Sequence, residues 1–94
     1  MYHIGYTSRA NYRFKMPELK NLCERSNDNN QKAGITGLLV HDGSRFMQVI
    51  EGDFEVVCHL MNNIVADTRH NQISYIAKDH KDARSFQSWG LACI

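Results

Sequence analysis

Two consecutive apolar runs in the middle of the chain limit its fold more than any other feature. Residues 34–41 and 45–50 are apolar at both odd and even positions, and the hairpin signal Asp42-Gly43-Ser44 separates them. Strand side chains alternate between the two faces of a sheet, so such runs are typical of central strands covered on each side. The sequence therefore predicts an antiparallel hairpin at the centre of a sheet.

One polar residue interrupts the second run. Gln48 shares its strand face with Phe46 and Ile50 rather than with solvent. Burying an amide without partners costs roughly 1–3 kcal/mol, so a polar group must meet it. A neighbouring backbone group or hydroxyl would satisfy this need, and so would a bound ligand, and these residues alone leave both interpretations open.

The other segments complete an alternating order of strands and helices. Tyr2, Ile4 and Tyr6 alternate with smaller or polar residues, which predicts a first strand with Tyr6 facing the core. Residues 11–15 are expected to form a polar connection. Residues 73–77 and 89–94 are expected to form a fourth and a fifth strand around a polar loop.

Helical spacing predicts two amphipathic helices. Pro17 and Glu18 suit the first turn of a helix from residue 16 to residue 29 or 30. The side of this helix that is expected to face the core is apolar near its N-terminus and polar near its C-terminus. The residues on that side are Leu19, Leu22, Cys23, Ser26 and Asn30. Asp53 is a plausible N-cap for a helix ending near residue 66, whose apolar stripe is Val57, Leu60, Met61 and Ile64.

The resulting order of elements predicts an α+β fold. We expect a ferredoxin-like, mixed five-stranded sheet with two helices on one face, in the order βαββαββ. A chain of 94 residues supports one hydrophobic core, so residues 1–94 are expected to form a single domain.

Composition excludes several classes of function. The net charge is +1 and the basic residues are scattered, which argues against a nucleic-acid partner. No apolar stretch reaches about 18 residues, which argues against a membrane span. Cys23, Cys58 and Cys93 are odd in number and far apart, which favours reduced thiols in a cytoplasmic protein. No histidine lies near a cysteine at ligand spacing, so no metal is expected.

Several short segments occur in one order along the chain and together resemble the BLUF family of blue-light sensors that use flavin. The segments are Tyr6-Thr7-Ser8, the run from Ser26 to Asn30, the run from Gly34 to Leu39, the run from Phe46 to Gly52, Asp67-Thr68-Arg69-His70 and Phe86-Gln87-Ser88-Trp89. Each segment alone is weak, but their ordered combination is specific and covers nearly the whole chain. The resemblance implies the same ferredoxin-like sheet.

The resemblance also implies a flavin site and a photochemical mechanism. Tyr6 and Gln48 match the photoactive pair, in which the tyrosine passes an electron and a proton to excited flavin and the glutamine then rotates or tautomerises. Leu22 and Ile64 would wall the ring, Asn30 would bind its pyrimidine edge, and Asn29 would be an accessory contact. Arg69 and His70 would lie near the flavin tail. FAD is the default cofactor, with FMN or riboflavin as alternatives.

Each of these residues also has an ordinary structural interpretation. Tyr6 alone would be a core tyrosine with a satisfied hydroxyl. Asn29 and Asn30 would form a helix end, because asparagine tolerates the left-handed conformation there. Arg69 and His70 would be favourable at the negative end of a helix dipole.

Two positions depart from the family pattern. Many members carry a methionine two residues after the tryptophan, and the two residues exchange places near the glutamine. This chain has Trp89 followed by Leu91, so the sulfur-bearing partner in the signal relay through the fifth strand is absent. Asn63 stands where a basic residue is often found.

The favoured function is a photoreceptor that is not an enzyme and that signals to a protein partner or an effector domain. Met47, Val49 and Ile76 are expected to project from the sheet face away from the helices and to attract that partner or a second copy of the chain. Two alternatives remain: a ferredoxin-like hydrolase of the acylphosphatase type, and a light-independent ligand- or protein-binding module. The sequence has no Gly-rich phosphate loop before either predicted helix, which argues against the hydrolase.

Overall fold

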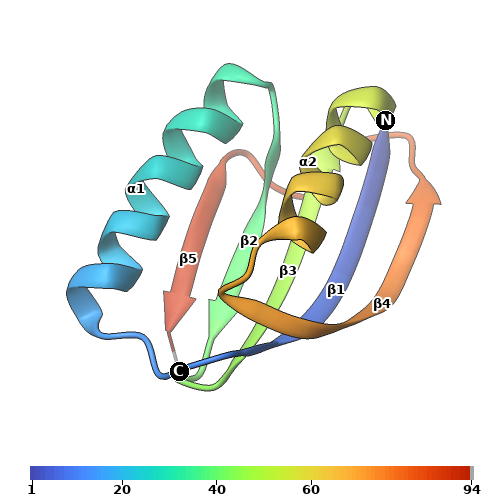
Figure 1. Ribbon diagram of the computed structural model, residues 1–94. Coiled ribbons are helices and arrows are strands. Elements are labelled where there is room, and N and C mark those ends of the chain that lie inside the picture. Colours follow the sequence, from blue (N-terminus) through green and yellow to red (C-terminus); the bar gives the residue numbers. More distant parts are fainter. Residues whose placement is uncertain (94) are drawn as a thin grey trace.

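The computed structural model describes residues 1–93, with only the backbone for residues 91–93. The elements follow the predicted order (Figure 1). They are β1 (Tyr2–Ala10), α1 (Met16–Lys32), β2 (Thr36–His41), β3 (Arg45–Gly52), α2 (Phe54–Ala66), β4 (His70–His80) and β5 (Trp89–Cys93). Within the described residues, no helix is both long and apolar enough to cross a bilayer.

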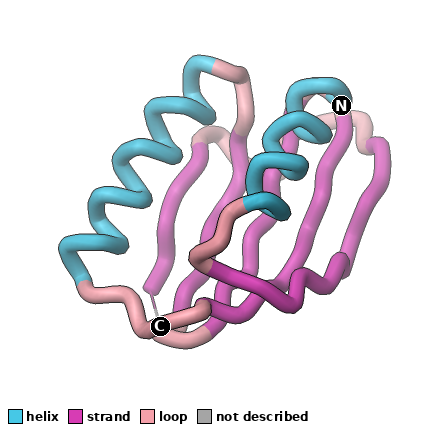
Figure 2. Tube along the Cα trace, viewed as in Figure 1, coloured by secondary structure: helices cyan, strands magenta, loops and turns pink. Residues whose placement is uncertain are grey.

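The five strands form one mixed sheet in the order β4-β1-β3-β2-β5. Neighbouring strands are antiparallel, except that β2 and β5 run parallel. Both helices lie on the same face of this sheet, as the cyan coils in front of the magenta strands show in Figure 2. The predicted ferredoxin-like α+β fold is therefore confirmed.

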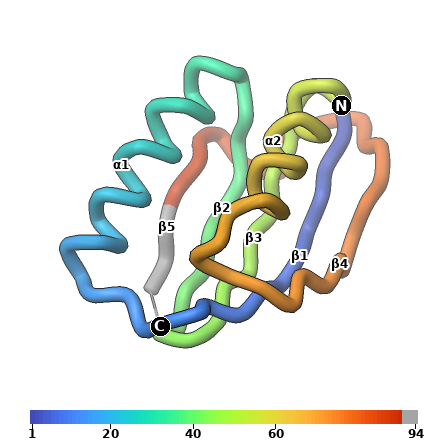
Figure 3. The backbone as a smooth tube through the Cα atoms, viewed as in Figure 1, coloured from blue at the N-terminus to red at the C-terminus, as the bar shows by residue number. Residues whose placement is uncertain are grey.

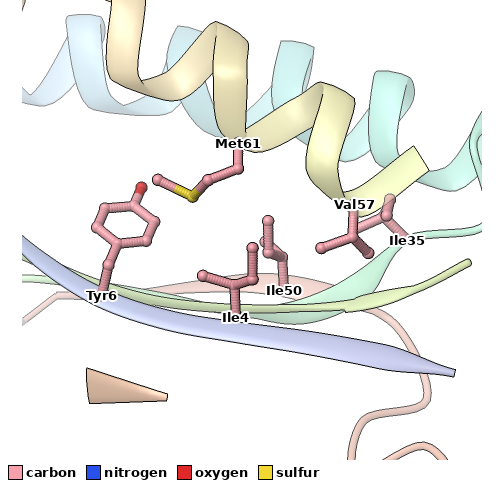
Figure 4. Packing of buried hydrophobic residues seen from close by; sticks show 6 residues of the cluster. All are labelled: Ile4, Tyr6, Ile35, Ile50, Val57 and Met61. Carbon is pink, nitrogen blue, oxygen red and sulfur yellow. The ribbon is translucent and has the colours of Figure 1, made fainter. Parts of the chain in front are cut away.

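The core between the helices and the sheet has two clusters. Under α2, Val57 and Met61 pack on buried residues of the strands, and Figure 4 shows Tyr6 at one end of this cluster with its hydroxyl beside Met61. Leu60 and Ile64 are partly buried against the same cluster, so the predicted α2 stripe is confirmed. The second cluster lies under α1 and contains Phe14, Leu19, Leu39, Phe46 and Trp89.

The predicted connection over residues 11–15 is confirmed, but it is not polar throughout. Phe14 is only 7% exposed and packs in the same cluster as Leu19. Lys15 is the N-cap, and its backbone N–H donates to the Glu18 carboxylate at 3.2 Å. Apolar residues just before the N-cap and at the fourth helical position form a hydrophobic staple, so Phe14 fixes the entry of the chain into the helix.

Several boundaries differ from the prediction. Helix α1 continues to Lys32, and β3 continues through Glu51 to Gly52, where a break was expected. Strand β4 is eleven residues long, because its backbone pairs with β1 even where its side chains are polar. At the start of α2, Asp53 is the N-cap, but its side chain makes no capping hydrogen bond.

The expectation that β2 and β3 are covered on both faces was also wrong. Their central place in the sheet is confirmed, but both described helices lie on one face. On the other face, here called the open face, Met47 is 40% exposed and Ile76 is 59% exposed, while Val49 is half-buried. The sequence pattern therefore marks a sheet face that no described element fully covers.

Candidate functional site

Tyr6 and Gln48 lie directly opposite each other across the β1–β3 pair, on the face covered by the helices. The Tyr6 hydroxyl donates to Gln48 Oε1 at 2.5 Å, and the two residues are only 3% and 6% exposed. The polar group that the buried glutamine requires is therefore a phenol from the neighbouring strand.

Burial keeps Tyr6 protonated. Desolvation raises the pKa of the phenol far above its ordinary value, and the negative charge of Asp67 adds to this effect. Because the phenol stays neutral, it remains a hydrogen-bond donor to Gln48 throughout the physiological pH range.

A pocket of about 210 Å³ opens between the sheet and the two helices beside this pair. Its walls come from both helices, and its floor comes from β1, β2 and β3. The lining residues are Tyr6, Phe14, Leu22, Ser26, Asn30, Leu39, Phe46, Gln48, Leu60, Asn63, Ile64, Asp67, Arg69 and His70. The structure thus brings most of the sequence-predicted site residues around one cavity.

Two side-chain amides face this cavity with hydrogen-bonding capacity that no described residue uses. Asn30 is 4% exposed, and its side-chain amide has no hydrogen-bond partner among the described residues, while its backbone carbonyl accepts from the Ile35 N–H at 2.8 Å. Gln48 uses Oε1 for Tyr6, which leaves its NH₂ group free to donate. Amide groups that face a pocket in this way can bind a ligand that carries hydrogen-bonding atoms at its edge.

The mouth of the pocket carries an internal ion pair. The Arg69 guanidinium donates through Nε and Nη2 to the Asp67 carboxylate, with N–O distances of 2.5 to 3.1 Å. The hydrogen bonds from Arg69 lower the pKa of Asp67. Arg69 also lines an adjoining polar groove of about 410 Å³, together with Asn29. Asn29 therefore lies outside the pocket itself.

His70 is engaged on both sides of its ring. Its Nε2 lies 2.6 Å from the Ile64 carbonyl oxygen and its Nδ1 lies 2.7 Å from the Ser8 hydroxyl. A carbonyl only accepts, so Nε2 carries a proton and donates. His70 thereby ties the end of α2 to β1, and it presents its ring rather than a free nitrogen to the pocket.

The two predicted relay residues lie on β5, and Trp89 is not among the described residues that line the pocket. Trp89 is 5% exposed, pairs with Gly37 in the β2–β5 register and packs under α1. Its indole N–H is buried and has no partner among the described residues. The backbone of Leu91 pairs with Leu39, but the Leu91 side chain is outside the described part of the structure.

Sequence reasoning did not assign the apolar lining residues Phe14, Leu39, Phe46 and Leu60 to the site, nor the polar lining residues Ser26, Asn63 and Asp67. Leu39 is the β2 partner of Gln48, and Phe46 lies two residues before Gln48 on the same face, so strand alternation contained the signal for both. The staple position of Phe14 before the helix contained the signal for that residue.

The chemistry of the lining suits a heteroaromatic ring. Leu22 and Ile64 provide apolar surface from the two helices, and the amides of Asn30 and Gln48 provide donors and acceptors at one side. A neutral phenol lies one hydrogen bond behind the Gln48 amide. Such an arrangement can bind an edge with carbonyl and ring nitrogen atoms and can pass a proton between Tyr6 and Gln48.

Comparison with known proteins points to the same kind of site. The family described as "BLUF: Sensors of blue-light using FAD" matches residues 1–92. The blue light- and temperature-regulated antirepressor BluF of Escherichia coli (strain K12) is 31% identical over 74 residues, which cover 79% of this chain and 18% of that protein.

Two solved structures are similar over nearly the full chain. Klebsiella pneumoniae BlrP1 with FMN and cyclic diGMP has a TM-score of 0.88 and 29% identity, over 99% of this chain and 25% of that one. A bacterial light-regulated adenylyl cyclase has a TM-score of 0.87 and 31% identity, over 100% of this chain and 27% of that one. The chain therefore spans about a quarter or less of the length of these relatives.

Proposed function

The chain belongs to the BLUF family of blue-light sensors, and from that premise we propose that residues 1–94 act as a flavin-binding photoreceptor module switched by Tyr6 and Gln48. The observation that carries the proposal is the buried Tyr6–Gln48 hydrogen bond, which leaves the Gln48 NH₂ group facing the pocket. A glutamine that was only structural would be expected to use both ends of its amide within the protein.

The described residues fit the ring of a flavin. Leu22 and Ile64 would pack against its faces, and Asn30 and Gln48 would bind its polar edge. Arg69, with Asn29 in the adjoining groove, would lie toward the tail, and the His70 ring would add a contact beside Tyr6. FAD is our default assignment. When bound, oxidised flavin supplies absorption of blue light and a site that accepts an electron.

Tyr6 is the electron and proton donor in this proposal. Its hydroxyl proton can leave only along the 2.5 Å hydrogen bond to Gln48 Oε1, because the phenol is buried. The electron and proton then return to Tyr6, so no net oxidation remains. The lasting change is the orientation or tautomer of the Gln48 amide.

The same contact explains how two states can both be stable. A tyrosine hydroxyl can donate or accept a hydrogen bond, so it can pair with either end of the amide. In the described arrangement Oε1 faces Tyr6 and the NH₂ group is free. After a flip, NH₂ would donate to Tyr6, and Oε1 would face the pocket. Exchanging a donor for an acceptor in a cavity of low dielectric changes the hydrogen bonding of any bound ring.

The output is proposed to pass to another protein or to an effector domain. The chain has no assigned enzymatic reaction in this proposal, and its open face presents the apolar side chains of Met47 and Ile76 for a partner or a second copy. Trp89 and Leu91 on β5 are the proposed relay. Leu91→Met, which restores the common family residue, should change the rate of dark recovery.

The visible spectrum of the purified, flavin-loaded protein tests the function directly. We expect a flavin spectrum that shifts slightly to the red under blue light and reverts in the dark. Gln48→Leu should keep the flavin and lose the shift, whereas Gln31→Leu, a matched change on the exposed side of α1, should behave as wild type. Protein that cannot be loaded with any flavin, or a normal red shift in Gln48→Leu, would contradict the proposal.

A further inference from the structure

A second buried polar group lies on the opposite face of the strand that carries Gln48. Glu51 follows Gln48 by three residues on β3, and pairs with His3 on β1 and Thr36 on β2. Strand alternation therefore directs Glu51 to the open face. Its side chain is nevertheless 0% exposed, which is rare for a carboxylate.

Four donors surround this carboxylate. Oε1 accepts from the Thr36 hydroxyl at 2.9 Å and from the Phe86 N–H at 2.7 Å. Oε2 accepts from the Lys81 ammonium at 2.8 Å and from the Ser85 N–H at 2.9 Å. A carboxylate has about four lone-pair sites, so the acceptor capacity of Glu51 is fully used.

Three of the four donors belong to the connection between β4 and β5. This connection runs from one edge of the sheet to the other and passes behind β1 and β3 in Figure 3. Arg84 strengthens the attachment, because its guanidinium donates to the Thr36 hydroxyl at 2.8 Å. Glu51 is therefore the point at which the central strand holds this crossing segment.

The attachment leads directly into β5. The Ser88 carbonyl accepts from the Gly37 N–H at 3.2 Å, and the next residue, Trp89, begins the strand. Because β5 is joined to the remainder of the chain through this connection, the position of residues 85–86 limits where Trp89 can enter the core under α1.

Stability alone is a poor explanation for this arrangement. A buried ion pair costs desolvation and is often no more stabilising than an apolar replacement, whereas its directional hydrogen bonds can specify one geometry. The hydrogen bonds also outweigh the desolvation that would raise the pKa of Glu51, and lower that pKa to about 2. The carboxylate is therefore charged, and able to hold its donors, at any physiological pH.

We propose that Glu51 is a positioning residue that fixes the β4–β5 connection to the Gln48 strand and thereby sets the position of β5 and Trp89. The second part of this proposal rests on the proposed light response: through this attachment, Glu51 couples a change at Gln48 to β5. Gln48 and Glu51 are close on one strand but face opposite sides, so the inner pocket and the open-face connection share a rigid element.

The anchoring part of the proposal is tested in the dark, on flavin-loaded protein, with Glu51→Gln. Glutamine keeps the shape but turns an NH₂ group toward two of the donors. Exchange of the Ser85 and Phe86 amides should become about tenfold faster or more. The indole N–H resonance of Trp89 should also shift, and it is unambiguous because the chain has one tryptophan. Glu55→Gln, an exposed acid in the first turn of α2, is the matched control.

If Glu51→Gln does not fold, Thr36→Val removes one donor while conserving shape, and the same resonances are measured. Unchanged exchange at Ser85 and Phe86, an unmoved Trp89 indole resonance, or equal changes in the control would overturn the anchoring role. These dark measurements do not depend on photochemistry, so they separate a failed anchor from a failed photoreceptor.

The coupling is tested by illumination of the same variants. Wild-type protein should show a light-dependent change in the Trp89 indole resonance, and Glu51→Gln should reduce it and alter the dark-recovery time by at least about twofold while keeping the red shift at the flavin. A light response at Trp89 and a recovery time equal to those of wild type would overturn the coupling, even if the dark measurements succeed.

Discussion

The Tyr6–Gln48 hydrogen bond predicts a measurable coupling between the two side chains, independent of light. Tyr6→Phe removes the hydroxyl and leaves Gln48 Oε1 buried without its donor. Leaving a buried acceptor unsatisfied costs about 1–3 kcal/mol of unfolding free energy. In a domain of this size, each 1 kcal/mol shifts the melting temperature by roughly 4–8 °C.

A double-mutant cycle isolates this contribution. In Gln48→Leu the acceptor is absent, so adding Tyr6→Phe should cost much less than it costs in the wild-type background. Chemical unfolding of the four proteins without flavin should give a coupling energy of about 1–3 kcal/mol. Additive effects, within about 0.5 kcal/mol, would show that the hydroxyl and the amide do not depend on each other, and would refute the reasoning for the pair.

Three further predictions concern the pocket, the sheet and acid stability. Asn30→Ala removes an amide that faces the pocket without a partner, so flavin should dissociate more readily in equilibrium titrations, and an unchanged binding isotherm would count against its role. Gly37→Ala would place a Cβ 1.9 Å from the Val49 carbonyl oxygen at a φ of 153°, so it should cost about 3 kcal/mol or more, while Gly90→Ala, with nothing within 4 Å, should be far milder in thermal melts. The pKa of Glu51 is about 2 in the folded protein against an ordinary 4.5, so its stabilisation is complete above pH 4.5 and is lost as the pH falls toward 2. The loss amounts to up to about 3 kcal/mol, and Glu51→Gln should flatten acid unfolding in that window.

The sequence predicted the fold well where apolar periodicity was strong. The hairpin of β2 and β3 and the α2 stripe follow from such patterns, and the Asp42 side chain accepts from the Ser44 and Arg45 N–H groups in the expected turn. The length of β4 was not predictable in the same way. Its exposed polar residues carry no periodic signal, and its backbone pairing with β1 is a tertiary interaction.

The candidate site was predicted less evenly. The alternation of side chains along each strand was enough to predict that Tyr6 and Gln48 face the core. The family resemblance was needed to predict that the two residues act as a pair. Spacing could not show that both ring nitrogens of His70 bind protein groups. It also gave no sign that Glu51, expected at a strand break, is the most enclosed acid in the described residues, because three of its donors come from a segment thirty or more positions away.

The hydrogen bonding of β3 limits how a signal can leave Gln48. Its backbone is paired with β1 on one side and with β2 on the other, so the strand resists displacement, and the amide is the part free to turn. The neighbours of Gln48 on its own face of the sheet are Tyr6 on β1 and Leu39 on β2. Leu39 in turn pairs with Leu91 on β5. Within the part of the chain that the structure describes, β5 is an edge strand whose sheet neighbour is β2. A change that begins as an amide rotation should therefore appear mainly in β5 and in the connection held by Glu51, while the backbones of β1 and β3 stay in place.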